Sequence, residues 1–531
     1  MMSKSAKTWR LLYLSLGLVG YSSPSVAKAE DPALARPAIQ VSNLSKCNEI
    51  RKADFSGIKE APTQIISTEY SERSGDKIAH CVVEGYVTPQ VGFKIFLPDF
   101  GWNGKFIQIG SGGHGGVIFD SGCAAALQRG YACLVSDLGH KGAGGDTEWA
   151  RGNLQARMDW GFRATHVATV AAKAIIQYYY GRLPSHSYFS GCSTGGRQAL
   201  QEAQKFPWDY DGIIAGAPPI RLSDLYVTFA WGALANRDAS GRMLLDRRDL
   251  DLLTKAALAK CDMDDGLRDG LIAQPQQCSF RPSELVCSEQ RTSQCLTPAQ
   301  IAAAEKIYSG PLDEEGKSLY GGGALPGSER QWERYYLDNI SGELPYFFNL
   351  TGGGFRMLFS DPQLPVDWKL KSFDFEKDFK MLDVMQSIYD SSNPDLTRFM
   401  NAGGKLIMFI GLNDVSMPNA VIDYYRKVGK ISGSKTNSFA RLFLLPGVDH
   451  CGGGPGAGSV DYLTYLEDWV ERQVPPSRLF AVHPGVGSRT GTGESVANGF
   501  SRPVFPYPTY PKYDGKGDPS KSESFVPAEM P

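Results

Sequence analysis

The stretch SYFSGCSTGGRQAL, Ser187–Leu200, decides the fold. A serine lies at its centre between Gly191 and Gly195, with a short apolar run before it and residues suited to a helix after it. A serine on a tight strand-to-helix turn forms a nucleophile elbow, and glycines on either side let the chain turn without a side-chain clash. The stretch therefore predicts Ser193 as a catalytic nucleophile. An ordinary strand-to-helix turn is the alternative, so the surrounding sequence must decide.

Short apolar runs alternate with helix-like runs on both sides of this stretch. This rhythm favours a parallel sheet covered by helices on both faces, so the sequence predicts an α/β fold. The strand-like runs are FKIFLP (93–98), KFIQI (105–109), YACLVS (131–136), DGIIAG (211–216), KLIMFIG (405–411) and ARLFLL (440–445), and the helix-like runs cover 165–181, 194–206 and 420–429.

The rhythm is interrupted between residues 218 and 384, where clustered cysteines, glycine-rich segments and many aromatic residues replace it. We interpret 218–384 as an inserted domain that divides a catalytic domain into two parts, 30–217 and 385–531. Arg356 in the insertion is a candidate for binding a ligand carboxylate or phenol, with a structural ion pair as the equal alternative. The proline-rich tail, 503–524, predicts an extended surface segment.

The N-terminus reads as a secretory signal peptide over residues 1–29. Three basic residues precede an apolar run at 11–19, and Ala27-Lys28-Ala29 supplies small residues at the cleavage positions. The run is too short to cross about 30 Å of hydrocarbon as a helix, which disfavours a membrane anchor. We therefore expect a secreted or periplasmic protein.

The charges are balanced, with 55 basic and 57 acidic residues and a formal net charge of −2 among 531 residues. No long basic run is present that would follow a nucleic-acid backbone or an anionic membrane. The composition favours a small neutral or weakly charged ligand, and it does not predict an oligomeric state.

A catalytic serine needs a histidine base that is oriented by a carboxylate, in the chain order serine, acid, histidine. Two histidines follow Ser193. His450 comes after an apolar strand in a glycine-rich loop, whereas His483 has an ordinary setting. Asp414 ends the strand-like run KLIMFIGLND, although it could instead cap the next helix. Asp449 adjoins His450 in sequence, which makes a bond to the inner imidazole nitrogen awkward. Ser193, Asp414 and His450 are the predicted triad.

An oxyanion hole requires backbone N–H groups that point to where negative charge develops. Thr194 follows the nucleophile and is expected to supply one. The loop GSGGHGG (110–116) follows a strand-like run and supplies the other from Gly112 or Gly113, of which we take Gly113. A flexible turn is the alternative reading of this loop. His114 is expected to line the pocket.

The ten cysteines are an even number, as a fully paired framework in an exported protein requires. Spacing suggests the pairs Cys261 with Cys278, Cys287 with Cys295 and, more distantly, Cys47 with Cys81. By elimination, Cys192 could reach Cys451, and whether Cys123 pairs with Cys133 stays open. Cys192 precedes Ser193 and Cys451 follows His450. A bond between Cys192 and Cys451 would therefore fasten the two catalytic loops together.

The segment CDMDDGLRDGLIAQPQQC, 261–278, concentrates four aspartates between two cysteines. Crowded carboxylates repel unless they are solvated or bind a hard cation, and calcium takes six to eight oxygen ligands. Positions 265, 267, 269 and 271 alternate and can point inward. An EF-hand is disfavoured because its distal glutamate is absent, and a solvated acidic turn is the alternative. We predict a structural calcium site.

Taken together, GCSTGG (191–196), CDMDDGLRDGLI (261–272), GLND (411–414) and GVDHC (447–451) resemble the tannase and feruloyl esterase family over nearly the whole mature chain. The resemblance implies an α/β-hydrolase domain with an inserted lid. It also implies the triad named above and a disulfide between Cys192 and Cys451. Calcium would be bound by Asp262, Asp265, Asp269 and the carbonyls of Leu267 and Leu271.

The same resemblance implies a small-molecule aromatic ester as substrate. Feruloyl esters, galloyl esters and terephthalate monoesters all fit, and the sequence does not separate them. A serine peptidase on the same scaffold and a non-catalytic binding protein are the competing classes. The filled triad positions disfavour the second of these.

Overall fold

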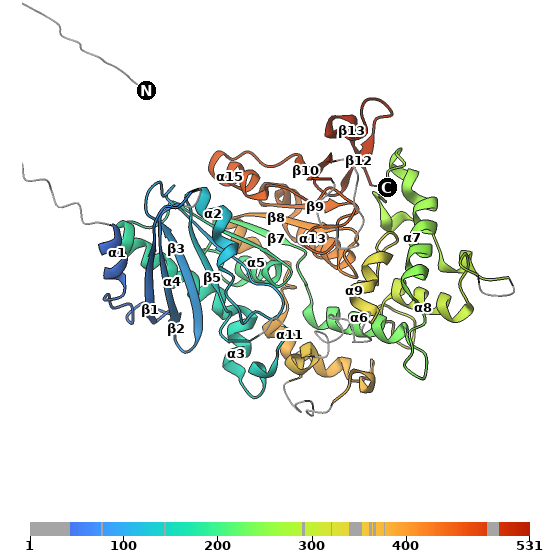
Figure 1. The fold of residues 1–531 in the computed structure, drawn as a ribbon, viewed down its shortest axis with the longest axis horizontal. Helices are drawn as coiled ribbons and strands as arrows, with labels where there is room; N and C mark the ends of the chain where they lie inside the picture. The colour runs from blue at the N-terminus through green and yellow to red at the C-terminus, as the bar shows by residue number, and fades with distance from the viewer. Residues whose placement is uncertain are drawn as a thin grey trace, which may run out of the picture. The chain divides into compact units, whose positions relative to one another are not determined.

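A nine-stranded mixed sheet organises the chain in the computed structural model (Figure 1). The described residues are 43–75, 78–142, 145–288, 292–319, 321–338, 353–359, 364, 368–375, 377–485 and 499–530. The predicted signal peptide, 1–29, lies outside them. The strands are β1 (Thr63–Ser71), β2 (His80–Val87), β3 (Val91–Pro98), β4 (Lys105–Ile109), β5 (Ala132–Ser136), β6 (His186–Cys192), β7 (Gly212–Gly216), β8 (Lys405–Gly411) and β9 (Ala440–Leu445).

The strands lie in the order β1-β2-β3-β5-β4-β6-β7-β8-β9. The first three strands are antiparallel, β3 is antiparallel to β5, and the remaining neighbours are all parallel. The loops that follow β4, β5, β6, β8 and β9 therefore share one edge of the sheet. This confirms the predicted parallel α/β organisation and gathers the glycine-rich, serine, aspartate and histidine loops at one edge.

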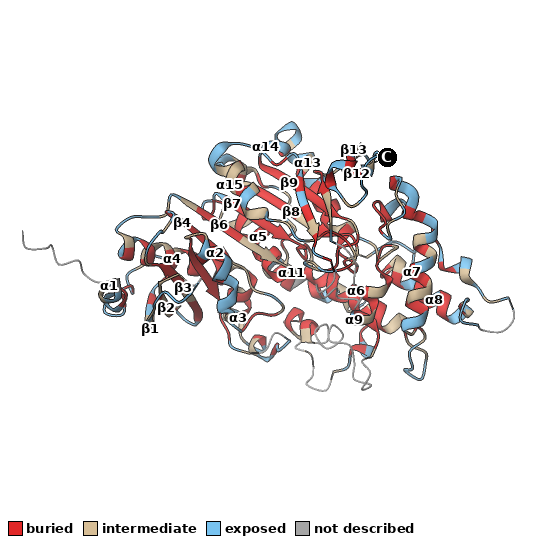
Figure 2. Cartoon of the chain, turned by 45° about the horizontal axis from the view of Figure 1, so that its top comes forward, coloured by how far each residue is buried: buried red, intermediate tan, exposed pale blue. Residues whose placement is uncertain are grey.

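Helices cover both faces of the sheet because successive strand residues are apolar in both directions. Leu406 and Met408 of β8 belong to one buried cluster, and Ile407 belongs to the other. The burial colouring shows the strands red between the helices (Figure 2). The first cluster includes residues of α4 (Ala164–Tyr180), α5 (Thr194–Lys205) and α13 (Pro418–Ser432), and the second includes residues of α2 (Ala124–Gln128) and α15 (Tyr462–Arg472).

The chain between β7 and β8 is mainly helical, and none of its described residues adds a strand to the sheet. The change of character predicted at 218–384 falls inside this connection, and its exact boundaries stay a prediction. The described chain from Asn43 onward forms one compact unit. Helices of the connection within the described residues include α6 (Leu222–Ala235), α7 (Arg247–Cys261), α8 (Pro298–Ser309), α9 (Trp332–Tyr336), α11 (Asp383–Tyr389) and α12 (Thr397–Asn401).

The proline-rich tail is folded rather than simply extended. It contributes to two small antiparallel sheets, which pair β10 with β11 and β12 with β13. No helix in the described ranges has the length and apolar character needed to span a membrane. The remaining elements are α1 (Asn43–Ile50), α3 (Leu154–Met158), α14 (Thr436–Phe439), β10 (Leu479–His483), β11 (Phe500–Val504), β12 (Thr509–Tyr513) and β13 (Phe525–Glu529).

Candidate active site

Ser193 occupies a sharp turn between β6 and α5. Its φ of 61° and ψ of −123° lie in a region that non-glycine residues rarely adopt. A Cβ on Gly191 would lie 2.6 Å from the carbonyl oxygen of Gly195, and one on Gly196 would lie 2.2 Å from the carbonyl oxygen of Gly216. Neither position has room for a side chain. These contacts explain why glycines surround the serine, and they give the turn the geometry of a nucleophile elbow.

His450 and Asp414 form a hydrogen-bonded pair on the neighbouring loops. Nδ1 of His450 lies 2.8 Å from Oδ2 of Asp414, which is buried. The two loops are held together because the backbone N–H of Asn413 donates to the carbonyl of Val448 at 3.0 Å. Burial disfavours the charged imidazole, but the charge and hydrogen bond of Asp414 outweigh it and raise the pKa of His450. The pair can thus orient the imidazole and stabilise its protonated form.

A disulfide joins Cys192 to Cys451 across 259 residues, with their Cα atoms 5.8 Å apart. Each cysteine is the direct neighbour of a predicted catalytic residue. The bond therefore fastens the loop of Ser193 to the loop of His450, as the sequence suggested. The other bonds join Cys47 to Cys81, Cys261 to Cys278 and Cys287 to Cys295, as expected from spacing, and Cys123 to Cys133, which the sequence left open.

The glycine-rich loop after β4 lies against the elbow. The hydroxyl of Thr194 donates to the carbonyl of Gly113 at 2.5 Å, and the side-chain oxygen of Gln198 accepts from the backbone N–H of Ser111 at 2.9 Å. Gly113 has a φ of 56°, a left-handed conformation that favours glycine. Both contacts place the loop beside the first turn of α5, where the predicted oxyanion donors belong.

His114 is buried in this loop, and its Nε2 lies 2.6 Å from the hydroxyl of Tyr226 in α6. Burial lowers the pKa of His114 to about 4, so the ring is neutral near neutral pH. A buried histidine paired with a tyrosine connects the loop to the insertion. Its place in the wall of the substrate pocket stays a prediction.

Asp449 is a second buried acid that the sequence considered only as an alternative triad member. Its Oδ2 accepts a hydrogen bond from Nε2 of Gln331 at 2.6 Å, across 118 residues of sequence. Burial first, and then repulsion from Asp414, raise the pKa of Asp449 to about 8. Asp449 therefore connects the histidine loop to the insertion instead of orienting His450. No local sequence pattern signals a contact of this kind.

The remaining candidates lie elsewhere. His483, in β10, is buried; its Nδ1 accepts from the backbone N–H of Gly485 at 3.1 Å, and its ring stacks on Phe500. Arg356 forms an ion pair with Glu148 at 3.5 Å, which matches the structural alternative weighed for it. The aromatic segment 344–350 lies outside the described residues.

The acidic loop is folded around its own carboxylates. Asp262 accepts backbone N–H groups from Asp269 and Gly270, and Asp265 accepts one from Leu267. Burial first, followed by repulsion from Asp269 and Asp262, helps raise the pKa of Asp265 to about 7. Crowded, buried aspartates of this kind have the oxygen-donor chemistry of a hard divalent cation.

One cation already contacts this loop from β11, where Arg502 forms an ion pair with Asp269 at 2.6 Å. Among the described residues, a different set has ligand atoms that all lie within 4.8 Å of one another: His166, Glu202 and Asp209. In that set His166 contacts Asp209 at 2.5 Å, so the imidazole supplies a hydrogen-bonding partner without any metal. The acidic loop fits calcium by its donor chemistry, while the other set is explained by its own hydrogen bond.

The fold and these loops define an α/β protein with a serine, an aspartate and a histidine gathered at one edge of the parallel part of the sheet. A model of the tannase and feruloyl esterase family matches residues 76–528. The chain belongs to this family, and it is a carboxylic ester hydrolase.

The chain is 32% identical over 526 residues to mono(2-hydroxyethyl) terephthalate hydrolase of Piscinibacter sakaiensis, with 85% of each chain covered. It is 32% identical over 447 residues to a probable feruloyl esterase of Arthroderma benhamiae, which covers 81% of this chain and 80% of its own. The solved structure of feruloyl esterase B from Aspergillus oryzae has a TM-score of 0.79 at 24% identity, covering 92% of this chain and 100% of that one. That structural likeness shows a shared fold.

Proposed function

We propose that the protein is an exported serine esterase that hydrolyses esters of aromatic, phenolic acids, on an α/β-hydrolase fold with the β7–β8 connection as its lid. The observation that carries the proposal is the disulfide-linked pair of loops, one with the strained Ser193 and the other with the Asp414–His450 pair. The strand order and the family membership support the fold assignment.

In this mechanism His450 removes the proton from the hydroxyl of Ser193 as the oxygen attacks the ester carbonyl carbon. Asp414 keeps Nδ1 protonated, so Nε2 is the basic nitrogen, and it stabilises the imidazolium that forms. The tetrahedral oxyanion is bound by the backbone N–H groups of Thr194 and Gly113. The imidazolium then protonates the departing alcohol, which leaves an acyl-serine. Water activated by the same imidazole hydrolyses the acyl-serine.

The substrate class rests on the relatives. Feruloyl esterases and a terephthalate monoester hydrolase are named among them, and both names refer to esters of aromatic acids. Feruloyl or galloyl esters are the primary proposal. The likeness to the terephthalate enzyme over 85% of each chain supports a terephthalate monoester as the second candidate.

Kinetic assays on methyl ferulate, methyl gallate and mono(2-hydroxyethyl) terephthalate test the proposal, with the matching anilides as a check for peptidase activity. We expect a kcat/KM for at least one aromatic ester that exceeds that for its anilide by about a thousandfold or more. In parallel, a serine-directed phosphonate is expected to label Ser193. Labelling of another residue would reject the mechanism. Equal activity on the anilides would reject the substrate class.

We further propose that the acidic loop holds a structural calcium ion through Asp262, Asp265 and Asp269 and the carbonyls of Leu267 and Leu271. The ion would supply the positive charge that the buried carboxylates require. It takes no part in the ester chemistry, and it stabilises the lid. Export is supported by the N-terminal sequence and by the five disulfides, because such bonds persist in oxidising compartments.

A further inference from the structure

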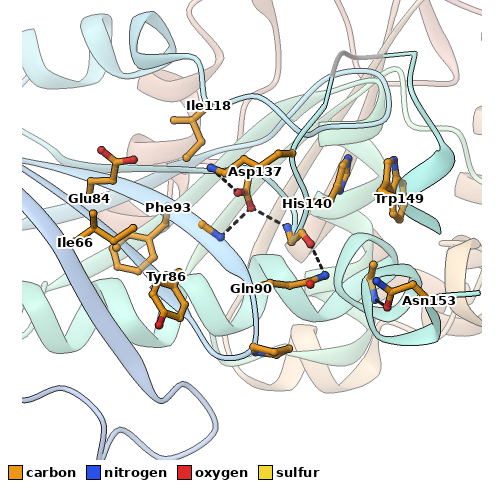
Figure 3. Close-up of a pocket in the computed structure, with 16 residues that line it drawn as sticks. Ile66, Glu84, Tyr86, Gln90, Phe93, Ile118, Asp137, His140, Trp149 and Asn153 are labelled. Carbon is orange, nitrogen blue, oxygen red and sulfur yellow. Dashed lines mark hydrogen bonds and ion pairs between the residues drawn. The ribbon is translucent and has the colours of Figure 1, made fainter. Parts of the chain in front are cut away.

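A cavity lies at the same sheet edge as the proposed active site. Its volume is about 490 Å³, which is within the range of small-molecule sites. It lies beyond β5, between the start of β3 and the loops that follow β5, and Figure 3 shows side chains from these elements around it. None of its lining residues belongs to the proposed triad or oxyanion set.

The cavity exists because the backbone leaves space there. Ile66 is the extra residue of a β-bulge in β1, and its side chain is 53% exposed at the cavity wall. Gly92 in β3 has no side chain, and a Cβ there would lie 2.3 Å from Oδ2 of Asp137. The bulge and the glycine therefore keep the wall open and make room for the buried carboxylate.

The walls are mainly apolar and aromatic. Phe93 and Ile118 line one part, and the stacked rings of His140 and Trp149, with centroids 4.0 Å apart, line another (Figure 3). Flat ring faces of this kind bind aromatic groups by stacking and edge contacts. Burial lowers the pKa of His140 to about 4, so this wall carries no charge near neutral pH.

The charged groups disfavour an anionic ligand. Asp137 accepts the backbone N–H groups of Gly92 and Gly139 and is paired with Lys141 at 3.2 Å. Since that pair neutralises itself, the carboxylate of Glu84 is the remaining charge among the lining side chains. An aromatic carboxylate would enter against this negative charge. A neutral aromatic molecule would contact the apolar and aromatic walls without this electrostatic repulsion.

The cavity wall is hydrogen-bonded to the proposed oxyanion loop. The backbone N–H of Gly116 donates to the carbonyl of Asp137 at 3.0 Å, and the N–H of Gly142 donates to the carbonyl of Gly116 at 3.2 Å. A Cβ on Gly116 would lie 3.1 Å from the ring of His140. A ligand packed on His140 is therefore one residue away from the loop that carries Gly113 to Gly116.

We propose that this cavity is an accessory site for a neutral phenolic molecule or phenolic group, separate from the acyl-binding site and coupled to the oxyanion loop through the wall formed by residues 137–142. Binding here is independent of the proposed mechanism. The effect on turnover rests on the proposed function of that loop.

The test uses the full-length enzyme with Ser193 blocked by an aromatic phosphonate, titrated with 4-methylphenol by calorimetry. We expect about one equivalent of 4-methylphenol to bind. Ile66→Trp should fill the mouth and weaken binding at least tenfold. Ile431→Trp is the matched control, because Ile431 is a 50% exposed isoleucine on α13 outside the cavity. Benzoate should bind at least tenfold more weakly than 4-methylphenol, and Glu84→Gln should reduce that difference.

In unblocked enzyme, 4-methylphenol should change kcat, and Ile66→Trp should remove that effect. No binding to the blocked enzyme, or unchanged binding in a folded Ile66→Trp variant, would overturn the accessory site. If Ile66→Trp does not fold, the Glu84→Gln titration decides, and an unchanged preference over benzoate rejects the site. Failure of the phosphonate to label Ser193 would instead count against the proposed mechanism, and the cavity would still be tested by titrating unlabelled enzyme.

Discussion

The sheet edge and the β7–β8 connection hold their functional groups by different physical means. At the sheet edge, parallel strands, close glycine contacts and a disulfide across 259 residues bring together loops that are distant in sequence. In the connection, disulfides close short loops with separations of 17 and 8 residues, and the acidic loop gathers aspartates that are neighbours in sequence. The first arrangement determines the geometry of distant groups, and the second holds short local loops and gathers negative charge.

This difference predicts where damage will appear. A change at the sheet edge should reduce turnover more than stability, because misplacing a catalytic group by about 1 Å can cost on the order of a hundredfold in rate. A change in the acidic loop should reduce stability first, since none of its residues is placed in the reaction.

Replacing the serine is the most severe test of the sheet edge. Ser193→Ala should lower kcat by about 10⁴-fold or more because the nucleophile is lost. The melting temperature should change little, because alanine keeps the same strained backbone conformation and only one hydroxyl group is removed. Steady-state kinetics and thermal unfolding on the same preparation measure both quantities. Retained turnover in the variant would exclude Ser193 as the nucleophile.

The sequence predicted the sheet edge better than the contacts between the sheet edge and the rest of the chain. Strands β4 to β9 are apolar on both faces, so they appear as continuous runs, and the order serine, aspartate, histidine followed from the loops after them. Strands β1 and β2 were missed because neither forms a continuous buried run: β2 alternates buried and half-buried residues, and β1 buries only its first residue, Thr63. The contacts of Gln331 with Asp449 and of Asp269 with Arg502, across 118 and 233 positions, could not be predicted, because these residue types have many possible partners, whereas a cysteine in a disulfide pairs only with another cysteine. Contacts between distant loops depend on packing that no local pattern records.

Removing the Cys192–Cys451 disulfide should lower kcat more than removing any of the other four disulfides. In a double Cys192→Ala, Cys451→Ala variant kcat should fall about a hundredfold. The free energy of unfolding should fall by on the order of 5 kcal/mol in the chain-entropy model. The matched control is the double variant Cys287→Ala, Cys295→Ala. Because that disulfide closes a short loop, its removal should lower the free energy of unfolding by about 2.5 kcal/mol and leave kcat nearly unchanged. Denaturant unfolding and kinetics at a temperature where both variants are folded compare them. Equal losses of activity would remove the special role of the Cys192–Cys451 bond.

Chelation tests the acidic loop. Removing calcium from enzyme that was saturated a hundredfold above Kd should lower stability by about 2.7 kcal/mol, equivalent to a Tm decrease of about 3 °C for a chain of this size. Asp265→Asn should abolish the effect of calcium while stabilising the metal-free enzyme, because a buried like charge is removed. Asp264→Asn is the control, since Asp264 is exposed and is not a proposed ligand. Scanning calorimetry with and without calcium, together with elemental analysis, measures the effect. An unchanged Tm and no bound metal would contradict the calcium site.

The smallest predicted effect concerns Asp449, where the two regions meet. Because His450 must be neutral to act as the base and Asp414 raises its pKa, the acidic limb of kcat/KM should have a midpoint above the usual histidine value of about 6.5. Asp449, with a pKa raised to about 8, is protonated below that pH and ionises above it. The new negative charge beside Asp414 and His450 should then reduce activity by a few-fold.

The same ionisation has a defined effect on stability. In the unfolded chain this aspartate ionises near pH 4, so between about pH 4 and 8 the folded state binds the extra proton, and stability must fall as pH rises through this window. Asp449→Asn should remove both the alkaline loss of activity and this slope, while keeping the hydrogen bond from Gln331 through its amide oxygen. Gln331→Glu is the opposite test, because a second carboxyl group facing Asp449 should make both effects steeper. pH profiles of kcat/KM and of unfolding free energy distinguish the outcomes, and an unchanged alkaline limb in Asp449→Asn would show that another group controls it.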